Sequence, residues 1–148
     1  MNLSKSRYCK GIQCPKILWM DKYMPEKASD INNDAVFETG NKVGDLAMGY
    51  FGEFTEVSYQ EDKSEMVAQT KELIDSGVEN ICEASFIFDG LYCAVDILHK
   101  NGNGWDIVEV KSSTSIHDIY YHDKAICFRA AVYNISWFTE KRYGPVRS

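Results

Sequence analysis

Residues 79–111 read ENICEASFIFDGLYCAVDILHKNGNGWDIVEVK and carry the strongest structural signal in this chain of 148 residues. Apolar and polar residues alternate along most of the stretch, which is the period-two pattern of β-strands. Asp89-Gly90 is a strong signal for a two-residue hairpin loop, and Asn101-Gly102-Asn103-Gly104 marks a second turn. The sequence therefore predicts three antiparallel strands in a meander, over 79–88, 91–100 and 105–110.

The two turns also predict the register of the strands. Directly opposed residues in a hairpin have numbers with a constant sum, which is 179 for the first turn and 205 for the second. Glu83 then lies opposite Asp96, and Asp96 lies opposite Glu109. Opposed side chains share a face of the sheet, and Lys111, two residues beyond Glu109, points to the same face. We expect three carboxylates and one lysine to form a row.

Two interpretations of this row remain open at this point. If the face is open to water, the row is a solvated surface and Lys111 is a surface counter-charge. The flanking positions, however, are strongly apolar on all three strands, so both faces of the sheet are expected to be largely covered. Carboxylates gathered in such a place raise one another's pKa unless a cation neutralises them, which favours a functional site.

Two or three carboxylates beside a lysine suit divalent-metal hydrolysis, above all of phosphodiesters. Mg²⁺ prefers hard oxygen ligands and retains waters that can attack phosphorus. A lysine beside the metal can stabilise charge that develops on the phosphate, or orient and activate the water.

The segments around residues 79–111 predict mainly helices. The expected elements are two short helices over 4–20 that break at Cys14-Pro15, a helix from Asp34 to Phe51, an edge strand over 54–59, a helix that begins at 62–65, and a helix from Asp118 onward. Ser4 or Ser6 can cap the first of these helices, Asp34 can cap the helix that it begins, and Asp62 can cap the helix that begins at 62–65. Gly77 can end that last helix in the left-handed conformation.

Composition indicates one globular domain over residues 1–148, because the chain is 45% hydrophobic and 26% charged with 3 Pro and 10 Gly. The expected fold is α/β (α+β), with a central mixed sheet that contains the meander and is flanked by helices. No apolar run approaches the ~18 residues of a membrane helix, and the N-terminus lacks a signal-peptide apolar block. We therefore expect a cytoplasmic protein.

The five cysteines, at positions 9, 14, 82, 93 and 127, are irregularly spaced and form no Cys-x-x-Cys pair. We expect reduced, mostly buried thiols rather than a disulfide framework or a cysteine metal site. The charges are also unevenly placed. Residues 1–27 and 124–148 each carry +4 within a total of −6, which leaves −14 on residues 28–123. Basic ends around an acidic centre suit a polyanion held beside metal-binding carboxylates, although a solvated acidic surface explains most of the charges.

Several strings resemble known motifs. Val95-Asp96-Ile97-Leu98 and Val108-Glu109-Val110-Lys111-Ser112-Ser113-Thr114 resemble the metal and catalytic motifs of the PD-(D/E)XK nuclease superfamily. Leu3-Ser4-Lys5-Ser6, Gln13-Cys14-Pro15-Lys16 with Leu18-Trp19, and Phe37-Glu38-Thr39-Gly40 to Val43-Gly44-Asp45-Leu46-Ala47 resemble the opening of a bacterial family in its RecB-like exonuclease branch, related to CRISPR-associated exonucleases. The similarity spans roughly residues 3–126.

The resemblance implies a restriction-endonuclease-like fold and a Mg²⁺- or Mn²⁺-dependent deoxyribonuclease. Asp96 and Glu109 would ligate the metal with the main-chain carbonyl of Val110, Lys111 would be the catalytic lysine, and Glu83 is a further candidate acidic residue. The substrate would be DNA that is single-stranded or has free ends. The clustered C-terminal cysteines of iron–sulfur members are absent from the sequence, so no such cluster is expected.

The chain also departs from this branch. No histidine lies over Gly40 to Gly44, and Cys127 and Ala131 stand where a Gln-x-x-x-Tyr helix motif is common. Family members generally run further, so we expect a C-terminus that is truncated or altered. These departures keep open a catalytically inactive remnant that binds nucleic acid or assembles a complex.

Overall fold

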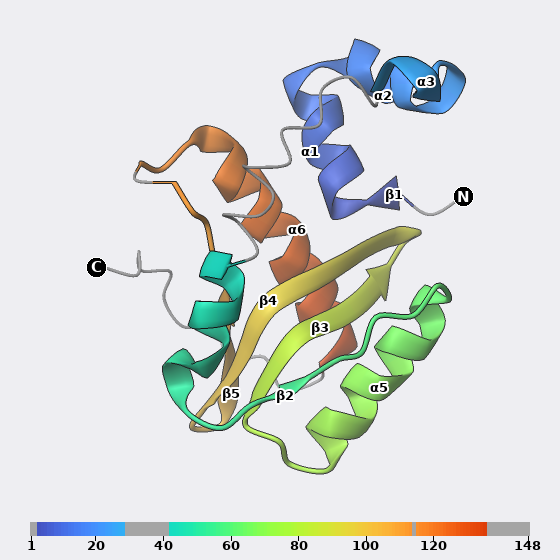
Figure 1. The fold of residues 1–148 in the computed structure, drawn as a ribbon. Coiled ribbons are helices and arrows are strands. Elements are labelled where there is room, and N and C mark those ends of the chain that lie inside the picture. Colours follow the sequence, from blue (N-terminus) through green and yellow to red (C-terminus); the bar gives the residue numbers. More distant parts are fainter. Residues whose placement is uncertain (1–2, 29–41, 114, 136–148) are drawn as a thin grey trace.

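The computed structural model describes residues 3–28, 42–113 and 115–135. Within these ranges a five-stranded mixed sheet is flanked by helices (Figure 1). The strands are β1 (Leu3–Ser4), β2 (Thr55–Glu56), β3 (Asn80–Phe88), β4 (Leu91–Asn101) and β5 (Gly104–Val108). The helices are α1 (Lys5–Gln13), α2 (Pro15–Tyr23), α3 (Pro25–Ala28), the 3₁₀ helix η2 (Gly49–Phe51), α5 (Lys63–Asp75) and α6 (Asp118–Asn134), and residues 42–48 are also helical.

Strands β3, β4 and β5 are antiparallel neighbours, and they pair in the predicted register. Cys82 lies opposite Ile97 and Ala84 opposite Val95, as the sum of 179 requires, and the β4–β5 pairs have the sum of 205. Asp89 and its glycine neighbour form the connecting loop with φ angles of 49° and 73°. Short polar residues and glycine tolerate this left-handed backbone, which explains why the turn forms here.

Two short parallel strands complete the sheet. β1 pairs with the start of β4, where the Leu3 N–H donates to Gly90 O over 2.9 Å, and β2 pairs with β3. The predicted edge strand over 54–59 is therefore real but only two residues long. Because Ser4 is both the end of β1 and the N-cap of α1, Lys5 begins a helix directly beside β4. This junction places the start of α1 beside β4 and α6.

The helix boundaries agree with the sequence signals at several points. Cys14 separates α1 from α2, and Pro15 occupies the first turn of α2, where its missing N–H costs nothing. Asp62 caps α5 by accepting a hydrogen bond from the Ser64 N–H, and Gly77 follows the helix with φ of 85°. None of the helices in the described ranges is long and apolar enough to cross a membrane.

The core lies between the sheet and helices α5 and α6. Helix α6 packs along β3 and β4, and α5 packs along β3 (Figure 1). The side chains that are at most 2% exposed include Val57, Thr70, Ile81, Ala84, Phe86, Cys93, Val95, Ile97, Leu98, Cys127, Ala130 and Ala131. Both faces of the sheet are thus covered, as expected.

The spacing of apolar residues predicts core-facing positions on two helices, and the structure confirms these only in part. On α6, Ile126 is buried as predicted, but Tyr133 is 73% exposed, and the small residues Ala130 and Ala131 are also buried against the sheet. In the helix over 42–48 and the turn that follows, Leu46 is 82% and Tyr50 is 67% exposed. The N-terminal half of that predicted helix, from Asp34, lies outside the described residues.

Candidate active site

Asp96 lies in the middle of β4 and is half-buried. Its Oδ2 accepts a hydrogen bond from the Val110 N–H over 2.5 Å, which ties β4 to the chain just beyond β5. Burial and the nearby charge of Glu109 raise the pKa of Asp96 to about 6, against the opposing effect of Lys5 and Lys111. A negative charge at Asp96 is therefore costly, and a cation beside it would be stabilising.

Glu83 lies opposite Asp96 by register, but the two do not form a regular strand pair. The pairs on both sides, Cys82 with Ile97 and Ala84 with Val95, keep the sum of 179, so no residue is inserted. Glu83 itself has φ of 56°, in the left-handed region that costs an ordinary residue about 1–2 kcal/mol. Burial raises the pKa of Glu83 above its usual range. Strained backbone of this kind is often found at functional sites.

Glu83 and Asp96 line one cavity of about 410 Å³. Two further carboxylates line it, Asp45 from the helix over 42–48 and Glu56 from β2, together with Val110. Among the described residues that line the cavity, none is basic. Several carboxylates with no basic side chain among these lining residues, in a space that admits water, form a donor set that suits a hard divalent cation.

Glu109 and Lys111 meet beside this cavity. Glu109 directly follows the last residue of β5, and its side chain is only 6% exposed. Lys111 Nζ lies 3.2 Å from Glu109 Oε2, so the predicted pairing of these residues on one face is present. Glu109 does not line the cavity, whereas Asp96, Glu83 and Val110 do. The predicted metal ligands therefore divide between an acidic cavity and a lysine-bound carboxylate.

Lys5 is a second lysine at this carboxylate. Its Nζ lies 3.0 Å from Glu109 Oε1, 3.1 Å from Oε2 and 3.0 Å from the main-chain oxygen of Ala94. Burial alone would lower the pKa of both Lys5 and Lys111, but the neighbouring carboxylates, Glu109 first, outweigh it and raise both pKa values. Both ammonium groups are thus held in the charged form.

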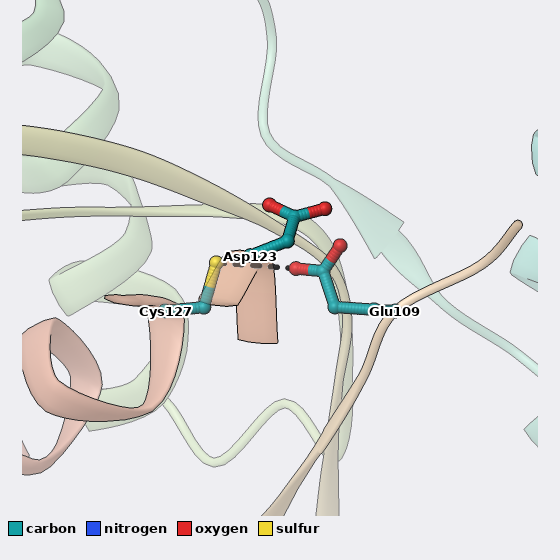
Figure 2. Close-up of side chains that lie close together, drawn as sticks. All are labelled: Glu109, Asp123 and Cys127. Carbon is teal, nitrogen blue, oxygen red and sulfur yellow. Dashed lines mark hydrogen bonds between the residues drawn. The ribbon is translucent and has the colours of Figure 1, made fainter. Parts of the chain in front are cut away.

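Helix α6 adds Asp123 and Cys127 to the cluster. Asp123 lies 3.4 Å from Lys5 Nζ and 2.7 Å from Lys111 Nζ, and the Cys127 thiol donates to Glu109 Oε1 over 3.1 Å. Figure 2 shows the side chains of Glu109, Asp123 and Cys127 pointing toward one another. A hydrogen bond with Cys93, then burial, raises the pKa of Cys127, so its sulfur stays a thiol and is a poor ligand for a hard cation.

Sequence reasoning missed Lys5, Asp123 and Cys127 as neighbours of the site. Asp123 and Cys127 are four residues apart on a predicted helix, a spacing that places both on one face and could have indicated them. Lys5 has no comparable local signal, because only the pairing of β1 with β4 brings it to Glu109. The acidic cavity is also lined by Asp45, which directly follows the segment from Gly40 to Gly44 where the family resemblance would place a histidine.

Comparison of the chain with protein-family models, with curated proteins and with solved structures found no match. The function must therefore be argued from the arrangement of the site itself.

Proposed function

We propose that this protein is a divalent-metal-dependent nuclease that hydrolyses DNA phosphodiester bonds, in the manner of the RecB-like exonucleases. One observation carries the proposal. Asp96 in the middle of β4 bonds to the segment that follows β5, where Glu109 and Lys111 contact each other, beside a cavity lined by Asp96, Glu83 and two more carboxylates.

The order of the elements supports a restriction-endonuclease-like fold. Asp96 belongs to the middle strand of three antiparallel neighbours, and Glu109-Val110-Lys111 follows the third. A helix, α6, then returns across β3 and β4 and brings Asp123 to the same place. In this proposal the acidic pair and the lysine come from one compact unit of sheet and helix, and the substrate approaches beside the acidic cavity.

Mg²⁺ or Mn²⁺ would be held by Asp96 and the main-chain carbonyl of Val110, with Glu83 and Glu109 as the other acidic groups. When bound, the ion would polarise the phosphodiester and lower the pKa of a bound water. Lys111, which stays charged beside Glu109 and Asp123, would stabilise negative charge on the phosphate. Asp123 would keep the lysine in place.

The N-terminal helices offer a surface for nucleic acid. Helix α2 lies beyond α1, away from the sheet (Figure 1). Trp19 and Tyr23 are 51% and 58% exposed on α2, and their rings lie 5.2 Å apart. Lys16 and Lys22 are exposed on the same helix. Aromatic faces among lysines are typical of single-strand binding, since bases stack and phosphates pair with ammonium groups. Of the basic C-terminal end, residues 136–148 lie outside the described residues.

One observation favours a second candidate, a catalytically inactive remnant that binds nucleic acid or assembles a complex. Lys5 bonds both oxygens of Glu109, so this carboxylate is already neutralised. Cys127 and Ala131, the residues in place of the Gln-x-x-x-Tyr motif, are fully buried and offer no polar contact to a substrate. In this alternative the charged cluster would only stabilise the fold.

Cleavage assays distinguish the two. The purified chain and its Asp96→Ala and Lys111→Ala variants are incubated with end-labelled single-stranded DNA, double-stranded DNA or RNA, in Mg²⁺, Mn²⁺ or chelator. Asp75→Ala and Lys71→Ala, which remove an exposed ion pair on α5, are matched controls. We expect DNA cleavage that needs metal, persists in the controls and is lost in both site variants. DNA binding without cleavage in any metal would favour the remnant, and neither binding nor cleavage would contradict both.

A further inference from the structure

The ammonium group of Lys5 is surrounded by oxygens, as a bound metal ion would be. Four oxygens surround its Nζ: two from Glu109 and one from Ala94 at 3.0–3.1 Å, and one from Asp123 at 3.4 Å. Its side chain is only 18% exposed. A long lysine side chain loses much rotamer freedom when it is fixed in this way, so the contacts must compensate for that cost. The lysine is therefore a built part of the site rather than a surface counter-charge.

The two halves of the site differ in how their carboxylates are balanced. Glu109 and Asp123 share two ammonium groups, from Lys5 and Lys111. The carboxylates of the cavity, which include Asp96 and Glu83, have no basic residue among the described residues that line it. The oxygens around Lys5 thus contact positive charge directly, whereas Lys5 acts on Asp96 and Glu83 only from outside the cavity lining.

We infer that Lys5 is a positioning residue that acts as a resident cation for Glu109 and Asp123. It holds these two carboxylates, and through them Lys111, in one geometry when no metal is bound. A divalent ion cannot share the place of the ammonium, because two positive centres at that distance would repel strongly. The single divalent ion of the proposed function therefore binds on the cavity side, at Asp96 and Glu83. This last point rests on the proposed function, whereas the role of Lys5 does not.

The test counts bound Mn²⁺ by calorimetry in the unaltered chain, in Lys5→Met and in Lys5→Arg. Methionine keeps a long side chain but removes the charge, so the oxygens of Ala94, Glu109 and Asp123 lose the Lys5 ammonium and can accept an ion in its place. Lys111 keeps its contacts with the outer oxygens, Glu109 Oε2 and Asp123 Oδ2. We expect Lys5→Met to bind one Mn²⁺ more per chain than the unaltered protein, and Lys5→Arg to bind the same number as that protein. Equal numbers in all three proteins would overturn the inference.

The difference between variants is independent of whether the nuclease proposal holds. If the unaltered chain binds no Mn²⁺ and Lys5→Met binds one, the metal site of the proposed function fails while the role of Lys5 stands. Asp96→Asn provides the reciprocal case, since it should remove the ion of the unaltered chain and leave the additional ion in the Lys5→Met/Asp96→Asn double variant. Loss of both ions from the double variant would show one shared site and would overturn the inference.

Lys5→Met is expected to be less stable without metal, because removing one partner leaves buried charge uncompensated. A second measurement, the midpoint of thermal unfolding monitored by circular dichroism, therefore accompanies the count of bound ions. Mn²⁺ should raise the midpoint of Lys5→Met by more than that of the unaltered chain, since the added ion binds only the folded form. A Lys5→Met chain that stays unfolded both with and without Mn²⁺ would overturn the inference as well.

Discussion

Lys5 Nζ donates to both carboxylate oxygens of Glu109, a residue 104 positions further along the chain. This contact joins the first turn of α1 to the segment after β5. Asp123 contacts the same ammonium from α6, so three distant parts of the chain meet at one charge. The site is therefore assembled by the whole fold, and changes in any of these elements should affect its stability and its chemistry together.

The raised pKa of Asp96 predicts that Asp96→Asn is more stable than the unaltered chain at neutral pH. An unfolded aspartate ionises near pH 4, whereas folded Asp96 keeps its proton up to about pH 6. The folded state then binds more protons within this window, so stability falls as the pH rises through it. Ionisation in the folded state costs up to about 3 kcal/mol above the window.

Urea unfolding of the metal-free proteins at pH 4 and pH 7.5 measures this effect. Asparagine can still accept the Val110 N–H, so the comparison isolates the charge. Asp96→Asn should gain about 1–3 kcal/mol at pH 7.5 and little at pH 4. Asp75→Asn, an exposed aspartate on α5, should change stability by less than about 0.5 kcal/mol. A destabilised Asp96→Asn at pH 7.5 would contradict the assignment of a costly charge.

Replacing Lys111 should separate chemistry from metal binding. Lys111 contacts Glu109 and Asp123 but does not line the acidic cavity. Lys111→Ala should therefore lower the rate constant of cleavage by a factor of about 10²–10⁴, while the affinity for Mn²⁺, measured by calorimetry, changes little. A loss of Mn²⁺ affinity as large as the loss of rate would show that Lys111 acts on the ion site instead.

The aromatic pair of α2 predicts how single-stranded DNA binds. Each stacked base contributes about 1–3 kcal/mol, so Trp19→Ala and Tyr23→Ala should each weaken the binding of oligothymidylate about 5- to 150-fold. Fluorescence anisotropy with a catalytically inactive background measures this. Tyr133, also exposed but at the end of α6, is the control, and Tyr133→Ala should bind normally. Equal effects at all three positions would argue against a stacking surface on α2.

Thiol labelling should distinguish the cysteines of the sheet and α6 from those of the N-terminal helices. Cys82, Cys93 and Cys127 are fully buried, burial raises the pKa of Cys82 to about 11, and the pKa of Cys127 is raised as well. Cys9 and Cys14 are half-exposed. With a thiol-reactive reagent at pH 8, native protein should react at Cys9 and Cys14, and denatured protein at all five cysteines. Fast labelling of Cys127 in native protein would contradict the described packing.

Asp96 and Glu109 show how much of the candidate site could be predicted from the sequence. Their predicted relation follows from the second turn and the period of the strands, both of which are local. The structure has this register as far as the pair of Ile97 and Val108, and Glu109 directly follows the end of β5. The contact of Lys111 with Glu109 follows from the same alternation. The left-handed backbone of Glu83 does not, because glutamate has no intrinsic preference for that conformation. Whether these residues perform catalysis stays a prediction.

The sequence by itself determined the elements whose causes are local: the turn at Asp89-Gly90, the cap at Asp62 and the break between α1 and α2. Only the tertiary structure decided that Lys5 and Asp123 meet at Glu109, and that the acidic residues divide between a cavity and a lysine-bound cluster. The physical reason is the separation along the chain of the residues that interact. Capping and hairpin turns are fixed by neighbours a few residues apart, whereas the charge balance of a site depends on side chains that folding brings together from across the chain.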